Sequence, residues 1–167
     1  RENDGSKEEI ASRARQHISE LLPLAGALGQ RILFENVWNG MFYKHGGAGD
    51  QGCQELVDFI DSFNSPWVGS YFDVGNHHRY GNMAAWIRTL GSRIVKLDLK
   101  GFNKQKAFDT KKDRQFCDIT EGDIDWADVR KALAEINFNG WTTAEVGGGD
   151  TKRLKKVLDD MKRALLG

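Results

Sequence analysis

The stretch Arg31-Ile-Leu-Phe-Glu-Asn36 is a short, almost continuous apolar run that ends in a carboxylate. Such a run is typical of a strand buried on both faces of a parallel sheet. The same pattern returns three times further along the chain, in Val68-Gly-Ser-Tyr-Phe-Asp73, Arg93-Ile-Val-Lys-Leu-Asp-Leu99 and Trp141-Thr-Thr-Ala-Glu-Val146. We therefore predict four buried strands, each with an acidic side chain at or near its carboxyl end.

Segments with helical periodicity separate these strands. The predicted helices cover residues 7–28, near 50–63, near 82–90, from the cap Asp125 through Ile136, and 151–166. Ser6 and Glu9 stand in the positions of a capping box at the start of the first helix. Strands that alternate with helices predict parallel βα units joined by right-handed crossovers, so the expected fold class is α/β.

The composition excludes several classes of protein. The 167 residues include 24 Lys and Arg against 24 Asp and Glu, so no net charge favours nucleic acid or an anionic membrane as an obligatory partner. No apolar run approaches the ~20 residues of a membrane span. Cys53 and Cys117 lie far apart without metal-ligand spacing, which argues against a disulfide scaffold or a zinc ribbon. We expect neither nucleic acid nor a membrane as partner, and the sequence leaves the cellular compartment open.

Acidic residues at the strand ends are the feature that points to chemistry. Parallel α/β folds bind ligands where the carboxyl ends of the strands converge. Any one of these acids could be a salt-bridged or capping residue, with Arg93, Lys96 or Lys100 as its partner. One acid on every strand instead favours a divalent-metal site of oxygen ligands, suited to Mn²⁺ or Mg²⁺. The candidate metal ligands are Glu35, Asp73, Asp98 and Glu145.

Three motifs closely resemble the sugar phosphate isomerase/epimerase family of xylose isomerase-like barrels, which includes ketose 3-epimerases. They are Phe34-Glu35-Asn36-Val37-Trp38-Asn39, Tyr71-Phe72-Asp73-Val74-Gly75-Asn76 and Glu121-Gly122-Asp123-Ile124-Asp125-Trp126. The resemblance covers nearly the whole chain from about residue 7 onward. It implies a (β/α)₈ TIM barrel, of which this chain supplies about four βα units that form the C-terminal half.

The resemblance also implies a mechanism. The family metal is held by Glu, Asp, His and Glu, which fall on Glu35, Asp73, Asp98 and Glu145, so Asp98 replaces the family His. In the resembling enzymes two metal-bound glutamates move a proton at a carbon next to a ketose carbonyl, through an enediolate. Here these would be Glu35 and Glu145. Isomerisation uses the same enediolate, so the residues do not separate it from epimerisation.

Substrate contacts are expected at the same rim. Trp38 is a candidate wall for the C–H face of a sugar, whereas Trp86, Trp126 and Trp141 are expected in the core or against helices. The Lys-rich segment 100–114 is a solvated loop by default, or a site for a phosphorylated sugar. His77 and His78 are expected to form a partly exposed loop pair, with the alternative that one of them replaces the missing family His as a metal ligand. The candidate substrate-binding residues are Trp38, Asn76, Lys100, Lys104 and Arg114.

Two other functions remain open. The exchange of the family His for Asp98 favours a catalytically altered or inactive sugar-binding barrel as the alternative. A phosphodiesterase like endonuclease IV shares this barrel but needs many histidines, and the chain has four. A complete barrel takes ~250 residues, so we expect residues 1–167 to be a single domain without its N-terminal half. Loss of that half, or pairing of two half-barrels in a homo-oligomer, would explain this.

Overall fold

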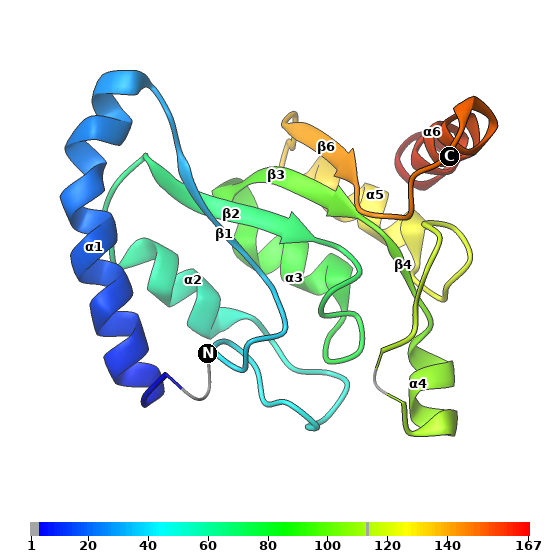
Figure 1. The fold of residues 1–167 in the computed structure, drawn as a ribbon, viewed down its shortest axis with the longest axis horizontal. Helices are drawn as coiled ribbons and strands as arrows, with labels where there is room; N and C mark the ends of the chain where they lie inside the picture. Colours follow the sequence, from blue (N-terminus) through cyan, green and yellow to red (C-terminus); the bar gives the residue numbers. More distant parts are fainter. Residues whose placement is uncertain (1–3, 113) are drawn as a thin grey trace.

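A computed structural model describes residues 4–112 and 114–167 of the chain. Its centre is a four-stranded sheet in the order β1-β2-β3-β6, formed by β1 (Ile32–Glu35), β2 (Val68–Asp73), β3 (Ile94–Leu99) and β6 (Trp141–Ala144). All three strand pairs are parallel (Figure 1). The four carboxyl ends therefore lie along one edge of the sheet. This arrangement confirms the predicted α/β class and the four βα units.

Five helices follow the predicted positions. They are α1 (Lys7–Leu28), α2 (Gln54–Asp61), α3 (Met83–Leu90), α5 (Trp126–Glu135) and α6 (Thr151–Leu166). The Ser6 hydroxyl accepts from Glu9 N and the Glu9 carboxylate accepts from Ser6 N, so the predicted capping box is confirmed. Asp125 caps α5, as predicted, by accepting from Asp128 N at 3.0 Å. These side chains satisfy amide groups that have no partner inside the helix.

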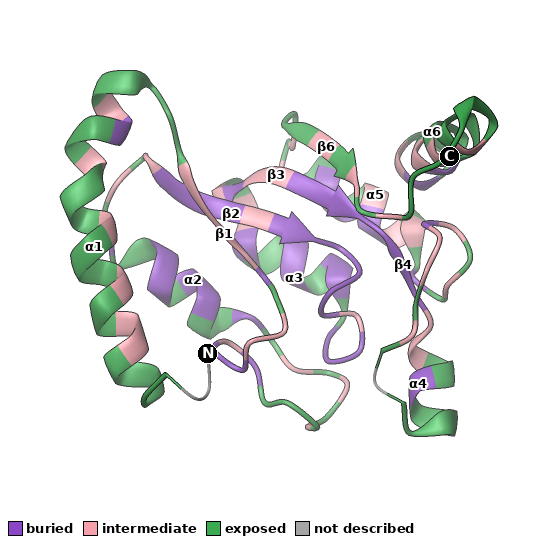
Figure 2. Ribbon diagram, in the orientation of Figure 1, coloured by how far each residue is buried: buried purple, intermediate pink, exposed green. Residues whose placement is uncertain are grey.

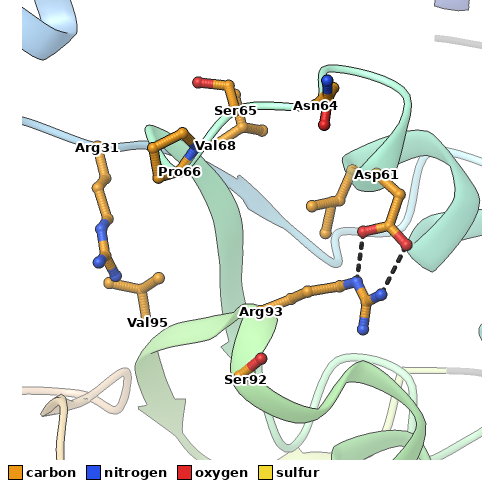
Figure 3. Close-up of a pocket in the computed structure, with 10 residues that line it drawn as sticks. Arg31, Asp61, Asn64, Ser65, Pro66, Val68, Ser92, Arg93 and Val95 are labelled. Atoms are coloured by element: carbon orange, nitrogen blue, oxygen red, sulfur yellow. Dashed lines mark hydrogen bonds and ion pairs between the residues drawn. The ribbon is translucent and has the colours of Figure 1, made fainter.

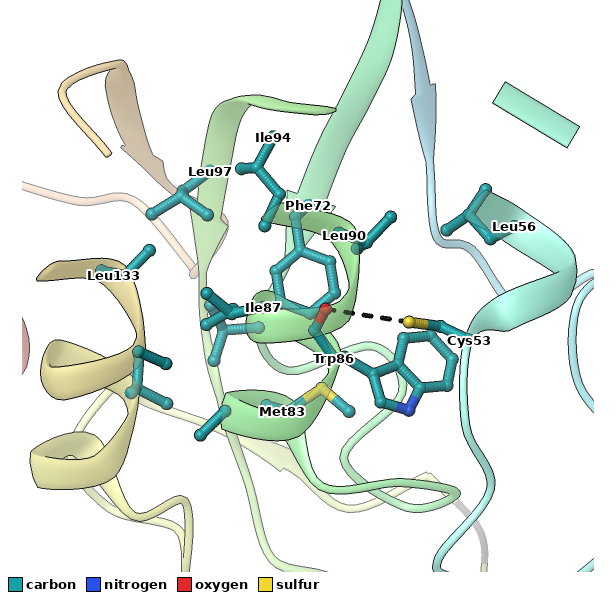
Figure 4. Packing of buried hydrophobic residues seen from close by; sticks show 14 of the residues in the cluster. Cys53, Leu56, Phe72, Met83, Trp86, Ile87, Leu90, Ile94, Leu97 and Leu133 are labelled. Atoms are coloured by element: carbon teal, nitrogen blue, oxygen red, sulfur yellow. Dashed lines mark hydrogen bonds between the residues drawn. The ribbon is translucent and has the colours of Figure 1, made fainter. Parts of the chain in front are cut away.

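The hydrophobic core lies between the sheet and the helices α2, α3 and α5. Figure 4 shows Phe72 and Leu97 of the sheet facing Ile87 and Leu90 of α3, and all four side chains are fully buried. In Figure 2 the buried residues concentrate on β2, β3, α2 and α3, while α1 and α6 are mostly exposed. Removal of this apolar surface from water stabilises the layer, and it fixes the strands whose ends carry the acids.

The segment after β3 is more ordered than the solvated loop that the sequence favours by default. It contains β4 (Gly101–Phe102), α4 (Lys104–Thr110) and β5 (Phe116–Cys117), with β4 and β5 antiparallel. A Cβ at Gly101 would lie 2.1 Å from the Asp118 carbonyl oxygen, so only glycine permits this close approach. The expectation of a loop is wrong for these elements, since two-residue strands are too short to show periodicity. The expectation of solvent exposure is confirmed for the side chains of Lys106, Lys111, Lys112 and Arg114.

The face of the sheet opposite α2, α3 and α5 is open, and within residues 4–112 and 114–167 no helix covers it (Figure 1). Trp141 opens β6, and it is 84% exposed. The prediction that Trp141 packs in the core or against a helix is therefore wrong. Trp141 pairs in register with Lys96, on the same open face as the acids. In a closed barrel this face would be the interior.

Candidate metal centre

Four carboxylates from the four parallel strands meet at one edge of the sheet. Glu35 ends β1, Asp73 ends β2 in register with Asp98 of β3, and Glu145 directly follows β6. One carboxylate oxygen from each residue lies within 4.8 Å of the other three. The structure thus brings together all four of the metal ligands predicted from the sequence. The donors are all oxygens, which suits a hard divalent cation.

Asp73 is the most buried member of the cluster, with a fully buried side chain. Its Oδ1 accepts hydrogen bonds from Gly75 N at 2.8 Å and Asn76 N at 2.6 Å. Its Oδ2 is buried and has no hydrogen-bond partner in the part of the chain that the structure describes. A buried oxygen of this kind needs a compensating group. In this structure the nearby cation is the Lys100 ammonium at 3.3 Å, and a metal ion at the cluster would compensate the oxygen in the same way.

Asn36 holds Asp73 in place. Its amide donates to the Asp73 carbonyl at 2.9 Å and accepts from the Asp73 amide at 2.7 Å, so a side chain extends the ladder between β1 and β2. His77 Nδ1 lies 3.1 Å from the same Asn36 amide nitrogen. Asn36 was not predicted as a site residue, although an asparagine directly after a strand-end acid was a usable signal.

Glu35 is positioned by two predicted substrate-binding residues. Asn76 Nδ2 donates to Glu35 Oε1 at 3.1 Å, and the Trp38 indole nitrogen donates to the Asn76 carbonyl. Partial burial, and then the charges of Glu145 and Asp98, raise the pKa of Glu35 above its usual value. In this structure the Asn76 side-chain amide therefore hydrogen-bonds to Glu35. Contact between Asn76 and a substrate stays a prediction.

Asp98 is oriented from the neighbouring strand. The Thr143 hydroxyl donates to Asp98 Oδ1, and Tyr71 Oη lies 3.0 Å from Thr143 Oγ1. Thr143 was not predicted as a site residue, because a threonine in a strand gives no sign of its neighbour in the sheet. The pairing of Asp98 with Thr143 follows from the β3–β6 register.

Lys100 lies among the carboxylates. Its ammonium donates to Glu145 Oε2 at 2.7 Å and lies 3.3 Å from Asp73 Oδ2. Burial alone would lower the pKa of Lys100, but the Asp73 and Glu145 charges outweigh burial and raise it. Desolvation likewise opposes ionisation of Glu145, yet the Lys100 ammonium holds the pKa of Glu145 below its usual value. The structure therefore places an internal ion pair within the group of candidate metal ligands.

The other basic candidates lie outside the cluster. The Lys104 ammonium donates to the Gly81 carbonyl at 3.1 Å and to the Gly49 carbonyl, which ties two loops together. Arg114 is exposed between α4 and β5. Binding of a substrate by either residue stays a prediction, and for Lys104 it requires release of these carbonyls.

The adjacent histidines do not join the metal ligands. His77 is buried, so the prediction of a partly exposed pair is wrong for this residue, because its ring stacks on Trp86 with the centroids 5.0 Å apart. Burial lowers the pKa of His77 to about 3. His78 is half-buried and lies 3.1 Å from Asp123 Oδ1. Both rings are therefore used in packing and pairing.

A separate hollow of about 400 Å³ lies at the amino ends of the strands (Figure 3). Arg93 lines it and donates two hydrogen bonds of 2.6 Å to Asp61. Arg93, one of the suggested partners of the strand-end acids, is thus paired at the opposite edge of the sheet. This hollow is not part of the carboxylate centre.

A parallel α/β half-barrel with acids at its strand ends defines a TIM-barrel protein with a candidate metal centre. The sequence profile described as "Xylose isomerase-like TIM barrel" matches residues 1–165. The chain belongs to this family.

Individual relatives agree with this assignment. The D-psicose 3-epimerase of Enterocloster bolteae is 29% identical over 113 residues, which cover 65% of this chain and 34% of that protein. A D-tagatose 3-epimerase-like protein of known structure superposes with a TM-score of 0.69 at 23% identity, covering 93% of this chain and 54% of that one. The IOLI protein with a bound zinc atom gives 0.71 at 16% identity, covering 97% and 58%. The chain thus spans between about a third and three fifths of these proteins.

Metal affinity is expected to rise with pH. Burial raises the pKa of Asp73 to about 7, and a carboxyl must lose its proton before it can ligate a cation. Without metal, folding favours the protonated Asp73 carboxyl over the ionised one. Protonated Asp73 therefore adds to the free energy of unfolding at pH values below its unfolded pKa of about 4, and this contribution is lost as the pH rises through about 7. A Mn²⁺ titration by calorimetry should show about tenfold tighter binding at about pH 7.5 than at about pH 6. Affinity that is flat across this range would contradict the role of Asp73.

Proposed function

We propose that this chain supplies the metal-binding and proton-transfer half of a sugar or sugar-phosphate isomerase/epimerase. The observation that supports this most strongly is the convergence of four carboxylates, with ligand oxygens within 4.8 Å, at the carboxyl ends of four parallel strands. Membership of the family described as xylose isomerase-like supports a sugar-converting activity. The likeness to D-psicose 3-epimerase favours a ketose as substrate.

The proposed cofactor is a divalent ion such as Mn²⁺ or Mg²⁺, held by Glu35, Asp73, Asp98 and Glu145. When bound, it would offset the negative charge that develops on the oxygens of an enediolate. The all-carboxylate donor set supports this assignment. Asn36 and Thr143 would keep Asp73 and Asp98 oriented toward the ion.

Proton transfer is proposed for the two glutamates. Glu35 and Glu145 come from β1 and β6, the outermost strands of the sheet, so they approach the cluster from its two sides. The raised pKa of Glu35 and the lowered pKa of Glu145 suit an acid and a base respectively. One glutamate would remove the proton next to the carbonyl, and the other would return one to the opposite face.

Recognition of the substrate is proposed for the remaining rim residues. The Trp38 ring would pack against the C–H face of the sugar, and Asn76 and Lys100 would bind its hydroxyl or carbonyl oxygens. Lys104 and Arg114 would bind a phosphate or acidic group. The open inner face of the sheet would be covered by the other half of the barrel or by a second copy of this chain. Contacts from that half would complete the site.

Solvent exchange tests the proposed reaction. In D₂O and with Mn²⁺ present, we expect the protein to exchange the carbon-bound proton next to the carbonyl of at least one ketose. The measurement is NMR across a panel of free and phosphorylated ketoses, with a metal-free sample as control. A panel without metal-dependent exchange would refute the proposed reaction.

A catalytically altered or inactive sugar-binding barrel is the second candidate. The observation that favours it is Lys100, whose ammonium already neutralises part of the cluster in which Asp98 replaces the family His. Such a protein would bind ketoses in the panel without exchanging their protons.

A phosphodiesterase is less favoured, because the carboxylate cluster contains no histidine. Within the described residues, no helix combines the length and the apolar character of a membrane span.

A further inference from the structure

We propose that Lys100 is an internal counter-ion that occupies the carboxylate centre of the metal-free protein and is displaced when a divalent ion binds. This inference rests on the proposed metal site and adds a competing cation to it. Lys100 and the ion would compete for the same two carboxylates, Asp73 and Glu145.

The position of the ammonium supports the competition. Lys100 Nζ lies 2.7 Å from Glu145 Oε2 and 3.3 Å from Asp73 Oδ2, two of the four ligand groups. Lys100 is 8% exposed, so little water screens these contacts. A divalent ion and an ammonium cannot both remain this close to the same oxygens, since like charges at such distances repel strongly.

The fold holds the lysine stem at the centre. Lys100 directly follows β3, and Gly75, two residues after Asp73, packs against it. A Cβ on Gly75 would lie 2.5 Å from Lys100 Cγ and 2.9 Å from the Lys100 carbonyl oxygen. The Lys100 side chain therefore occupies space that is available only because residue 75 has no Cβ atom. A lysine held in this way is part of the site rather than a freely moving surface cation.

The Phe116 ring offers a second binding position for the Lys100 ammonium after displacement. Lys100 Nζ lies 4.8 Å from the centroid of the Phe116 ring, and Phe116 is 41% exposed. A cation over an aromatic ring is attracted by the electrons of its face. Movement toward this ring would separate Lys100 from the carboxylates while keeping one favourable contact. The freed ammonium would then be available to an oxygen of the substrate, so the substrate-binding role proposed for Lys100 would apply to the metal-loaded state.

Calorimetric titration with Mn²⁺ at a single pH tests the inference on the full chain. Lys100→Met removes the charge and keeps a stem of similar length, so it should bind Mn²⁺ about tenfold or more tightly than the unaltered chain. The control is Lys155→Met, because Lys155 is an exposed lysine on α6 and does not lie on the sheet that carries the carboxylates. This control should change the affinity by less than about threefold.

Labelling of the unaltered chain keeps the test independent of the folding of any variant. Acetylation of Lys100, followed by mass spectrometry, should increase severalfold when Mn²⁺ is added, while acetylation of the exposed Lys155 on α6 stays constant. Equal or weaker Mn²⁺ binding by Lys100→Met, or labelling that does not change, would overturn the displacement but leave the metal site intact. Absence of Mn²⁺ binding by both the unaltered chain and Lys100→Met would overturn the metal site and this inference together.

Discussion

Replacement of Glu145 with glutamine is expected to abolish exchange of the substrate's carbon-bound proton with D₂O. An amide cannot accept that proton, and loss of a general base costs a factor on the order of 10² to 10⁴ in rate. Glu145 is one of the two candidates for the base, because it follows the outermost strand β6 at the edge of the carboxylate cluster. Its side chain is also half exposed, so a substrate can reach it.

The Glu145→Gln experiment must separate proton transfer from metal binding, since Glu145 is proposed for both. Exchange should therefore be measured at Mn²⁺ concentrations that saturate the variant, as shown by titration. Glu55→Gln is the matched control, because Glu55 is exposed on α2 and pairs only loosely with Lys7 at 3.6 Å. Full exchange in saturated Glu145→Gln would remove Glu145 from the mechanism.

Replacement of Asp73 with asparagine is expected to have the largest effect on metal affinity. Asparagine keeps an oxygen that can accept from Gly75 N and Asn76 N, but it removes the charge at the buried Oδ2 position. Loss of one of four ligand charges should weaken Mn²⁺ binding by about 100-fold or more, above the ~10–100-fold that loss of an outer-shell partner costs. Calorimetry measures this directly.

The stability of Asp73→Asn provides the internal check. Burial opposes ionisation of Asp73, so a neutral side chain should not lower the melting temperature of the metal-free protein at neutral pH. Asp109→Asn is the control, because Asp109 is exposed on α4 and should affect neither quantity. Unchanged Mn²⁺ affinity in Asp73→Asn would show that Asp73 is a structural acid.

Much of the fold could be predicted because its signals are local. Apolar runs marked the four strands, and Ser6 with Glu9 marked the start of α1. The acids could be predicted as a cluster because parallel strands place their carboxyl ends together. The short strands β4 and β5 could not, since two residues carry no periodicity.

The fine structure of the site depends on contacts across the sheet. Asn36 acts on Asp73, and Thr143 acts on Asp98, through pairings that only the register defines. Lys100 was one of three basic residues suggested as partners for the acids, and only the structure distinguishes it from the others. His77 lies in the loop between β2 and α3, as expected, but its burial could not be predicted because that loop folds its ring onto Trp86 of α3.

The central claim is that four strand-end carboxylates form one divalent-metal site. Titration of the unaltered chain with Mn²⁺, followed by calorimetry and by thermal unfolding, tests it most directly. We expect one ion to bind per chain and the melting temperature to rise with Mn²⁺ concentration, because a ligand that binds only the folded state stabilises it. A chain that binds no Mn²⁺, and whose melting temperature is unaffected by it, would contradict the claim.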